Sequence, residues 1–416
     1  MGKTIIEKII QAHTNEEVEP GKIVWIELDV ISARDFGGPN VVKNYEREYG
    51  DSPIAKPDKT FFTFDLVAPA KNIKYAINQE ICRNFAKKHN IKVYDVDSGI
   101  GTHVLLEEGK VGPGDIAVGT DSHYNILGAI GAFGQGMGDI DIAYAFKTGR
   151  TWFEVPETIK VIVKGKPSES ASPKDLTLYI LKKLGTKEAL GKAIEFYGEA
   201  VEELSLHGRI TLCSMVTEMA GIVGFIPFND KIREELKKFN PNIKDQPQPD
   251  PDANYSKVIE IDVEGIGPQV AAPPHPHNVF DVSELKDVKI ESAFVGSCTN
   301  GRYEDIEVVA NMLKGKKIPE GIRFSVVPAT RDIYGRLLKN GLLEILFDAG
   351  VIVANASCGG CAEGHIGLTG EGEIQITTGN RNFPGKQGKG KTYLASPATV
   401  TASALLGRIA SADEVR

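Results

Sequence analysis

The chain has 416 residues, 41% of them hydrophobic and 25% charged, which is enough for two or three domains with sizeable cores. Its net charge of −8 and the lack of a sustained basic stripe argue against nucleic acid as a partner. No apolar run approaches the roughly 18 residues that cross a bilayer, and the first residues lack the pattern of a secretory leader. We therefore expect a cytoplasmic protein with no membrane contact.

Runs of strand length alternate with helical patterns along most of the chain. An amphipathic helix is expected at residues 5–10, and later helical patterns cover residues 303–317 and 333–350. This alternation predicts an α/β fold with parallel sheets, in which ligands bind at the carboxyl ends of strands. Strands are expected at residues 22–30, 91–96, 115–120, 158–165, 290–298, 322–329 and 350–357.

Two boundaries divide this pattern. A helical stretch gives way to a new strand near residues 155–157, and Pro-rich runs at residues 240–257 and 271–278 precede the last part of the chain. We interpret the Pro-rich runs as ordered loops between domains. The prediction is three similar α/β lobes, at residues 1–158, 159–284 and 285–416.

Three of the five cysteines are grouped in the last third of the chain. Cys298 ends a strand in VGSCTNGR, and Cys358 and Cys361 follow another strand in NASCGGCAEGH. A Cys-x-x-Cys pair alone could be a redox dithiol, or part of a zinc site with His365 as its fourth ligand. Three cysteines without a fourth suit an iron–sulfur cluster with one open iron.

The other two cysteines, and a glycine-rich segment, are interpreted as structural. Cys82 and Cys213 lie in helical stretches and are expected to pack as small buried hydrophobic residues. The glycines of residues 128–138 lack the Lys-Ser/Thr of a phosphate loop, so we expect them to allow close packing.

Several long segments together resemble the large subunits of the aconitase superfamily, and in length and layout those of the 3-isopropylmalate and homoaconitate dehydratase type. They are GTDSHYNILGAIGAFGQGMGDIDIA, VGSCTNGR, SCGGC, GNRNFPGKQG and YLASPATVTASAL. The resemblance implies three α/β lobes around one central [4Fe–4S] cluster, held by Cys298, Cys358 and Cys361 with one iron open. It also implies a hydro-lyase of amino-acid biosynthesis that dehydrates and rehydrates a small 2-hydroxy di- or tricarboxylate.

The same resemblance implies a partner and further site residues. The catalytic base of the family is a serine on a swivelling domain, which is expected here on a small subunit, so the chain alone should be inactive. Near the cluster and substrate, the resemblance places Asp121, Ser122, His123, Glu218, Asn380 and Arg381. Asp121 and Ser122 could instead form a turn with a helix cap, Glu218 could be a solvated helix residue, and Arg381 could form a surface ion pair.

Five positions depart from the family pattern. Asp65 is followed by Leu66 where the family has a histidine, and Thr102-His103 stands for the family's His-Gln. The other three departures are Arg34 for Gln or His, Ser214 for Asn, and Lys386 for Arg, with Arg34 and Lys386 interpreted as substrate-binding. Because leucine cannot donate a proton, our hypothesis is that His103 or His123, with Arg34, replaces the missing acid.

The leading prediction is therefore a 3-isopropylmalate dehydratase large subunit. Homoaconitate or a substituted malate with a rearranged acid catalyst is the alternative substrate. From another class, the chain could be an iron–sulfur protein that binds RNA without catalysis, or a relative that has lost activity.

Overall fold

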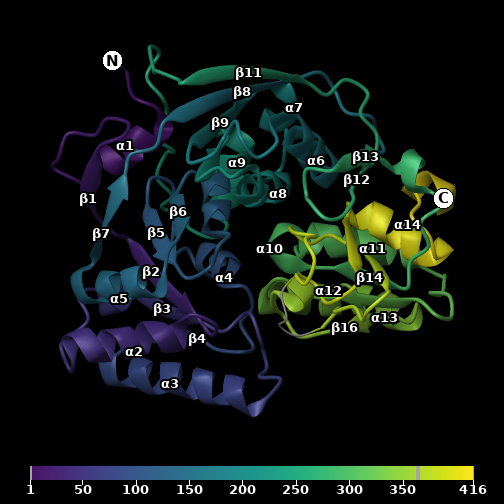
Figure 1. Ribbon diagram of the computed structural model, residues 1–416, viewed down its shortest axis with the longest axis horizontal. Helices are drawn as coiled ribbons and strands as arrows, with labels where there is room; N and C mark the ends of the chain where they lie inside the picture. Colours follow the sequence, from purple (N-terminus) through teal and green to yellow (C-terminus); the bar gives the residue numbers. More distant parts are fainter. Residues whose placement is uncertain (1, 362–365, 416) are drawn as a thin grey trace.

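The computed structural model describes residues 2–361 and 366–415, and within these residues the strands form four sheets of two, four, five and seven strands (Figure 1). Helices alternate with the strands along the chain. The predicted α/β class with parallel sheets is confirmed. His365, considered above as a zinc ligand, lies outside the described residues.

The first part of the chain forms the five-stranded sheet. Its strands are β2 (Val30–Arg34), β3 (Thr60–Thr63), β4 (Lys92–Tyr94), β5 (Ile116–Gly119) and β6 (Phe133–Gly136). All pairs are parallel, in the order β4-β3-β2-β5-β6. The adjacent residues Phe61 and Phe62 belong to two separate cores, because successive side chains of a strand point to opposite faces. Both faces of this sheet are therefore buried.

Helices cover this sheet, and three of them pack together at the lower left of Figure 1: α2 (Gly38–Tyr49), α3 (Ile73–His89) and α5 (Asp139–Thr148). The remaining elements of this part are α1 (Ile5–Gln11), η1 (Pro57–Lys59), α4 (Gly101–Glu107) and η2 (Tyr124–Ile130). The amphipathic helix expected at residues 5–10 is thus confirmed.

The single strand predicted at residues 22–30 is wrong in one respect, since two sheets share this segment. Strand β1 (Ile23–Glu27) pairs antiparallel with β7 (Arg150–Glu154), and β2 starts at Val30 in the five-stranded sheet. Between them, the Asp29 carboxylate accepts hydrogen bonds from the Ile116 N–H and from His13. These two bonds hold Asp29 in place at the point where the chain passes from one sheet to the other.

The middle of the chain forms the four-stranded sheet, at the top of Figure 1. Its strands are β8 (Thr158–Lys164), β9 (Ala193–Tyr197), β10 (Val223–Phe225) and β11 (Lys257–Asp262), which run parallel in the order β10-β9-β8-β11. The associated helices are α6 (Pro173–Leu184), α7 (Glu199–Glu202), α8 (Leu206–Ser214), η3 (Met215–Met219) and α9 (Asp230–Lys237).

The glycine-rich segment joins these two parts of the molecule. A Cβ atom on Gly128 in η2 would lie 2.0 Å from the carbonyl oxygen of Gly224 in β10, and one on Gly134 would lie 2.0 Å from that of Tyr124. Any larger residue would separate these backbones. The expected role of these glycines in close packing is confirmed.

The last part of the chain forms the seven-stranded sheet. Strands β14 (Ser292–Val295), β15 (Arg323–Val326), β16 (Ile352–Val353), β17 (Ile374–Thr377) and β18 (Lys391–Leu394) are parallel. β12 (Gln269–Ala271) and β13 (Val279–Asp281) extend it in antiparallel fashion at the β18 side, although both precede residue 285. The boundaries of the three lobes stay a prediction.

The helices around this sheet are α10 (Ser297–Asn300), α11 (Tyr303–Leu313), α12 (Arg331–Lys339), α13 (Leu342–Asp348) and α14 (Pro397–Leu406), with η4 (Val282–Leu285), η5 (Gly359–Cys361) and η6 (Ala412–Val415). The helical pattern at residues 333–350 forms two helices. Gly341 lies between them at φ 72°, a left-handed conformation that ends the regular helix.

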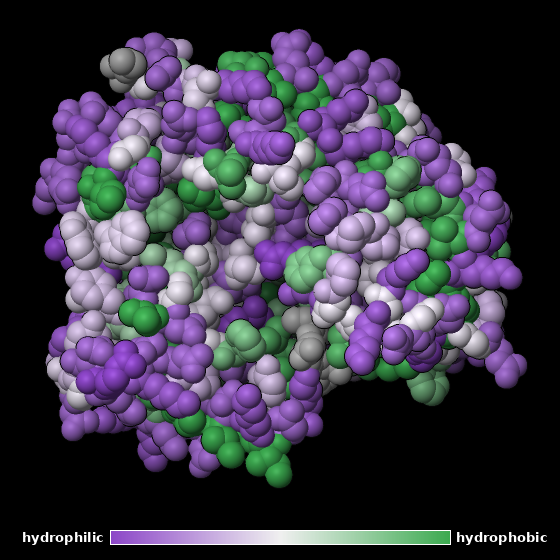
Figure 2. All heavy atoms as spheres, in the orientation of Figure 1, coloured by the Kyte–Doolittle hydropathy of each residue, from purple (hydrophilic) through white to green (hydrophobic). Residues whose placement is uncertain are grey.

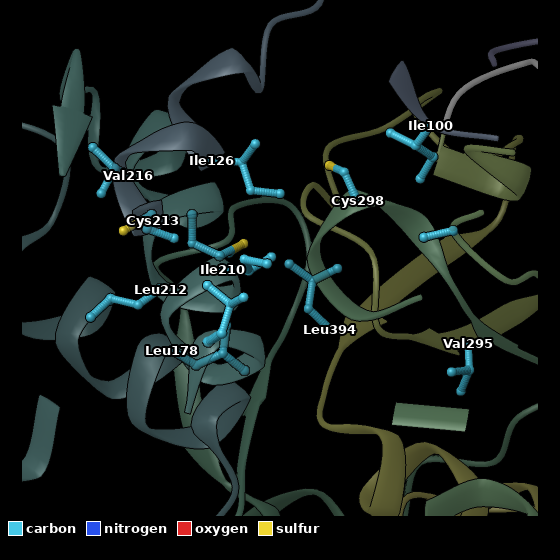
Figure 3. Close-up of a cluster of buried hydrophobic side chains, with 14 of the residues drawn as sticks. Ile100, Ile126, Leu178, Ile210, Leu212, Cys213, Val216, Val295, Cys298 and Leu394 are labelled. Atoms are coloured by element: carbon cyan, nitrogen blue, oxygen red, sulfur yellow. The ribbon is translucent and has the colours of Figure 1, made fainter. Parts of the chain in front are cut away.

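One apolar core passes between the three parts, and Figure 3 shows Cys298 among its residues, drawn between Ile126 and Ile100. Cys82 and Cys213 are fully buried, as predicted. Among the described residues, no helix is both long and apolar enough to span a bilayer.

Candidate active site

The predicted site residues follow the carboxyl ends of strands in two sheets. Arg34 ends β2, Asp65 follows β3 by two residues, and Asp121 follows β5 by two. Since these strands are parallel neighbours, their side chains meet at one edge of the five-stranded sheet. In the seven-stranded sheet, Cys298 follows β14 and Asn380 follows β17. The face of the molecule in Figure 2 is hollowed near its middle, between the two sides.

Arg34 joins the residues at the first of these edges. Its Nε donates to Asp65 Oδ1 at 2.8 Å, and its Nη1 lies 3.3 Å from Asp121 Oδ1. The other oxygen of Asp65 accepts the N–H of Gly101, at the start of α4, at 2.8 Å. Burial raises the pKa of Asp65, and despite the opposing charge of Arg34 it stands at about 7.

The loop that carries Asp65 is held by a neighbouring carboxylate. Asp35 is fully buried and accepts the backbone N–H groups of Asp65, Leu66 and Val67 at 3.3, 3.0 and 2.9 Å. A carboxylate with several backbone donors is well stabilised without a cation. Asp35 therefore fixes the position of the Asp65-Leu66 pair. Sequence reasoning missed it, although a polar residue at the end of an apolar strand was an available signal.

His103 is buried with both of its ring nitrogens occupied. Its Nε2 donates to the carbonyl of Cys298 at 2.8 Å, and its Nδ1 accepts from Arg302 Nη1 at 3.1 Å. Burial, followed by the charge of Arg302, lowers the pKa of His103 to about 3. The imidazole is therefore neutral and supports the turn that carries Cys298. Arg302 is a second residue that sequence reasoning missed, although it lies in the quoted VGSCTNGR segment.

A closed ring of four side chains forms the centre of the site. His123 Nε2 donates to Glu218 Oε1 at 3.1 Å, and Arg381 Nε donates to the same oxygen at 2.7 Å. Ser122 Oγ completes the ring, at 3.2 Å from His123 Nδ1 and 3.4 Å from Arg381 Nη1. The four residues come from the loop after β5, from η3 and from the loop after β17.

The ring leaves one carboxylate oxygen open. Burial raises the pKa of Glu218, but His123 and Arg381 outweigh it, and the pKa lies below its ordinary value. Its Oε2 is buried and accepts no hydrogen bond from the described residues. A charged oxygen in this position would accept a proton from a ligand, or a hydrogen bond from a ligand hydroxyl group.

Asn380 connects two of the three predicted cluster cysteines. Its Nδ2 donates to Cys298 Sγ at 3.7 Å, and the thiol of Cys361 approaches its Oδ1 at 3.9 Å. Asn380 Nδ2 also donates to Ser214 Oγ, which lies 3.7 Å from Cys298 Sγ. The third cysteine, Cys358, accepts a hydrogen bond from Arg34 Nη2 at 2.8 Å.

The turn before Cys298 is strained. Ser297 has φ 74°, which costs an L-residue about 1–2 kcal/mol. Its Oγ compensates by donating to Asn380 Oδ1 at 3.1 Å and accepting the Thr299 N–H at 3.2 Å. Such strain is typical of functional positions.

A third residue that sequence reasoning missed supports Asn380 from behind. Lys174 is fully buried, and its ammonium donates to the carbonyls of Thr378 and Gly379 at 3.1 and 2.9 Å. Burial lowers the pKa of Lys174 to about 8. The burial of Lys174 could not be predicted from the sequence, because no feature of residues 173–184 indicates that this lysine faces inward.

The remaining predicted residues lie at the margin. Leu66 is buried beside Asp65, and Thr102 Oγ1 is buried without a hydrogen-bond partner among the described residues. Lys386 is half-buried in the loop after Arg381, and its ammonium has no ion-pair partner in the described part of the chain. The structure thus brings together all the predicted residues except Lys386, for which it shows no contact with the others.

The donor set fits an iron–sulfur cluster. No group of three His, Cys, Asp or Glu side chains within residues 2–361 and 366–415 converges on a single metal ion. A cluster does not need such convergence, because each thiolate binds a different iron. Here Cys298 comes from one turn and Cys358 and Cys361 from another, and their sulfurs contact the side chains of Asn380 and Arg34.

Comparison with known proteins accounts for this arrangement. The family model described as "Aconitase family (aconitate hydratase)" matches residues 7–407. The chain belongs to the aconitase family. Proteins of the aconitase family bind a [4Fe–4S] cluster.

Relatives within the aconitase family match the whole chain. The 3-isopropylmalate dehydratase large subunit 1 of Methanopyrus kandleri is 42% identical and covers 98% of both chains. The 3-isopropylmalate dehydratase large subunit of Hydrogenobaculum sp. is 44% identical over 100% of this chain and 99% of its own, and that of Aquifex aeolicus is 43% identical over 100% and 98%.

A solved structure supports the fold alone. The holo form of Thermococcus kodakaraensis aconitase X is 14% identical, with a TM-score of 0.52 over 86% of this chain and 84% of that one. This similarity is consistent with aconitase-type domains.

Proposed function

We propose that this chain is the large subunit of a hydro-lyase of the 3-isopropylmalate dehydratase type. The observation that carries the proposal is that Arg34 and Asn380 contact the three cysteine sulfurs, and that Arg34 also contacts Asp121, whose carboxylate accepts the N–H of His123 in the ring. Full-length relatives with that name support it. The cytoplasmic location stays a prediction.

In this proposal Cys298, Cys358 and Cys361 hold one [4Fe–4S] cluster, with one iron lacking a protein ligand. The cluster would supply a Lewis acid that polarises the hydroxyl group to be eliminated. Asn380 and Ser214 contact the sulfur of Cys298 and orient it. Their role is to support the cluster.

Arg381 is the proposed substrate anchor. Its Nε and Nη1 are held by Glu218 and Ser122, while Nη2 makes no hydrogen bond with the described residues. A guanidinium held in this way presents a fixed donor to a substrate carboxylate. Lys386, on the same loop, is proposed to bind a second carboxylate.

The proton donor is proposed to be His123. Leu66 cannot donate a proton, and His103 is a neutral imidazole, since burial and Arg302 lower its pKa to about 3 and its Nε2 is bonded to the Cys298 carbonyl. His123 touches the open carboxylate of Glu218, which can accept a proton in turn. Asp65 and Asp121, held by Arg34, give this side of the site its negative charge.

The printed names of the relatives indicate a small-subunit partner. We propose that this subunit is a swivel domain that carries the catalytic base. The chain alone is therefore expected to be inactive.

The departures at Leu66 and Thr102 favour one alternative. Leu66 stands where the family pattern has a histidine. It makes the site apolar beside Asp65, and another residue has to be the acid catalyst. Homoaconitate or another substituted malate could then be the substrate.

The test is turnover by the chain combined with its small subunit and reconstituted anaerobically with iron and sulfide. 3-Isopropylmalate, homoaconitate and substituted malates are offered in turn, and formation of the unsaturated product is followed by its absorbance. C298S, C358S and C361S should each lose cluster absorbance and turnover, whereas C213A, which alters a buried thiol outside the site, should keep both. Turnover by the large subunit alone, or by C298S, would contradict the proposal. A specific mobility shift of structured RNA would favour the RNA-binding alternative.

A further inference from the structure

The guanidinium of Arg34 contacts the sulfur of Cys358. Nη2 of Arg34 lies 2.8 Å from Cys358 Sγ, and the two residues are 324 positions apart in the chain. The Cys358 N–H is in turn bonded to the carbonyl oxygen of Asp65 at 2.8 Å. Arg34, Asp65 and Cys358 thus form one hydrogen-bonded unit.

All three nitrogens of Arg34 are occupied by protein atoms. Nε and Nη2 contact Asp65 Oδ1, at 2.8 and 2.6 Å, and Nη1 contacts Asp121 Oδ1 at 3.3 Å. The side chain is only 11% exposed. Arg381, by contrast, is 21% exposed, and its Nη2 makes no hydrogen bond with residues that the structure describes. The geometry of Arg34 therefore does not favour the substrate-binding role predicted from the sequence.

The other two cysteines have neutral partners. Cys298 Sγ lies 3.7 Å from both Ser214 Oγ and Asn380 Nδ2, and Cys361 Sγ lies 3.9 Å from Asn380 Oδ1. Among the described residues, the contact of Arg34 with Cys358 is the one hydrogen bond between a cationic side chain and a cysteine sulfur. Cys358 therefore differs from Cys298 and Cys361, because its sulfur has a positively charged hydrogen-bond donor.

We propose that Arg34 is a positioning residue that stabilises the thiolate of Cys358 and raises the reduction potential of the cluster. This inference rests on the proposed function, since it requires the three cysteines to hold a cluster. A hydrogen bond from a positive donor to a ligand sulfur stabilises negative charge, and a reduced cluster carries one more negative charge than an oxidised one. Arg34 therefore favours the reduced state. Asp65 and Asp121 hold the guanidinium in place, and their negative charges oppose this effect.

The test is a redox titration of the reconstituted chain, with dithionite as reductant and the reduced cluster followed by electron paramagnetic resonance. R34Q removes the positive charge and the hydrogen bond from the guanidinium to the sulfur. R34K keeps the positive charge but loses the planar guanidinium that contacts Asp65, Asp121 and Cys358 at once. R302Q is the matched control. Arg302 is a buried cation, 7% exposed, that bonds to His103 and contacts no cysteine sulfur.

The midpoint potential of R34Q should shift to more negative values by clearly more than that of R302Q, with R34K between R34Q and wild type. Equal shifts in R34Q and R302Q, or no shift in R34Q, would overturn the inference and leave the proposed function intact. If R34Q does not fold, R34K is compared with R302Q by the same criterion. Failure of the wild-type chain to assemble a cluster, seen in its iron and sulfide content, would overturn the proposed function as well.

Discussion

Glu218 and Arg381 form an ion pair with 2.7 Å between Oε1 and Nε, although 163 residues separate them in the chain. His123, from the loop after β5, bonds to the same oxygen at 3.1 Å. The three residues belong to three different parts of the fold. The ring can therefore form only when all three parts are packed together, which couples the site to the global fold.

Replacing Glu218 by glutamine should lower kcat roughly 100-fold or more, since general acid–base groups contribute about that much. The amide keeps the shape of the side chain but lacks the negative charge to which His123 and Arg381 donate their hydrogen bonds. Turnover of the assembled enzyme at saturating substrate measures the effect. E202Q, at an exposed glutamate of α7, is the control and should behave as wild type. Wild-type kcat in E218Q would refute a role in proton transfer.

The two histidines should respond differently to glutamine. His123→Gln should lower kcat roughly 100-fold or more, because the amide cannot transfer a proton to or from Glu218. His103→Gln should cost much less, because its amide can still donate to the Cys298 carbonyl. Turnover and iron content of both variants are compared. An equal or larger loss of kcat in H103Q, with iron content unchanged, would instead identify His103 as the acid.

Asp35→Ala should lower the free energy of unfolding by about 3 kcal/mol, because backbone N–H groups of three residues lose a buried acceptor. Urea unfolding followed by circular dichroism measures the change. Asp51→Ala is the control, since Asp51 is an exposed residue paired with Lys88, and it should leave the unfolding free energy nearly unchanged. Equal stability of D35A and D51A would show that the loop of Asp65 does not depend on Asp35.

The pair of His13 and Asp29, joined at 2.7 Å, should make stability depend on pH. Burial raises the pKa of Asp29, but the bonds from His13 and Ile116 outweigh it and lower that pKa from 3.8 to about 2. Burial lowers the pKa of His13, but Asp29 and the Ile9 carbonyl raise it above 6.5. The contribution of Asp29 is thus lost as the pH falls below 3.8, and that of His13 is lost as the pH rises through its raised pKa.

H13Q isolates this effect, because glutamine can still donate to Asp29 without a charge. The free energy of unfolding of the wild type should exceed that of H13Q by about 1 kcal/mol between pH 4 and 6.5, and by less on either side. Urea unfolding across that range measures the difference. A difference that does not change with pH would mean that the pair contributes only a neutral hydrogen bond.

Much of the fold could be predicted because its signals are local. Strand-length apolar runs next to helical patterns indicated parallel α/β sheets, and most of the expected strands lie where predicted. The split between β1 and β2 was missed because Glu27 and Asp29 alternate with apolar residues, as polar residues do along a single half-buried strand. What ends β1 is the pairing of Asp29 with His13 and Ile116, which depends on segments distant in the sequence.

The sequence by itself determined the chemical groups of the site: three thiols without a fourth, an Asp-Ser-His turn after a strand, and an arginine after another. Residue type and motif decide these, because only thiolates and charged side chains can do that chemistry. The tertiary structure alone decided which group meets which. Arg34 contacts Cys358 across 324 residues, and His103 bonds to the Cys298 carbonyl, because the carboxyl ends of two sheets face one another. The roles of these two residues follow from that geometry, which has no local trace in the sequence.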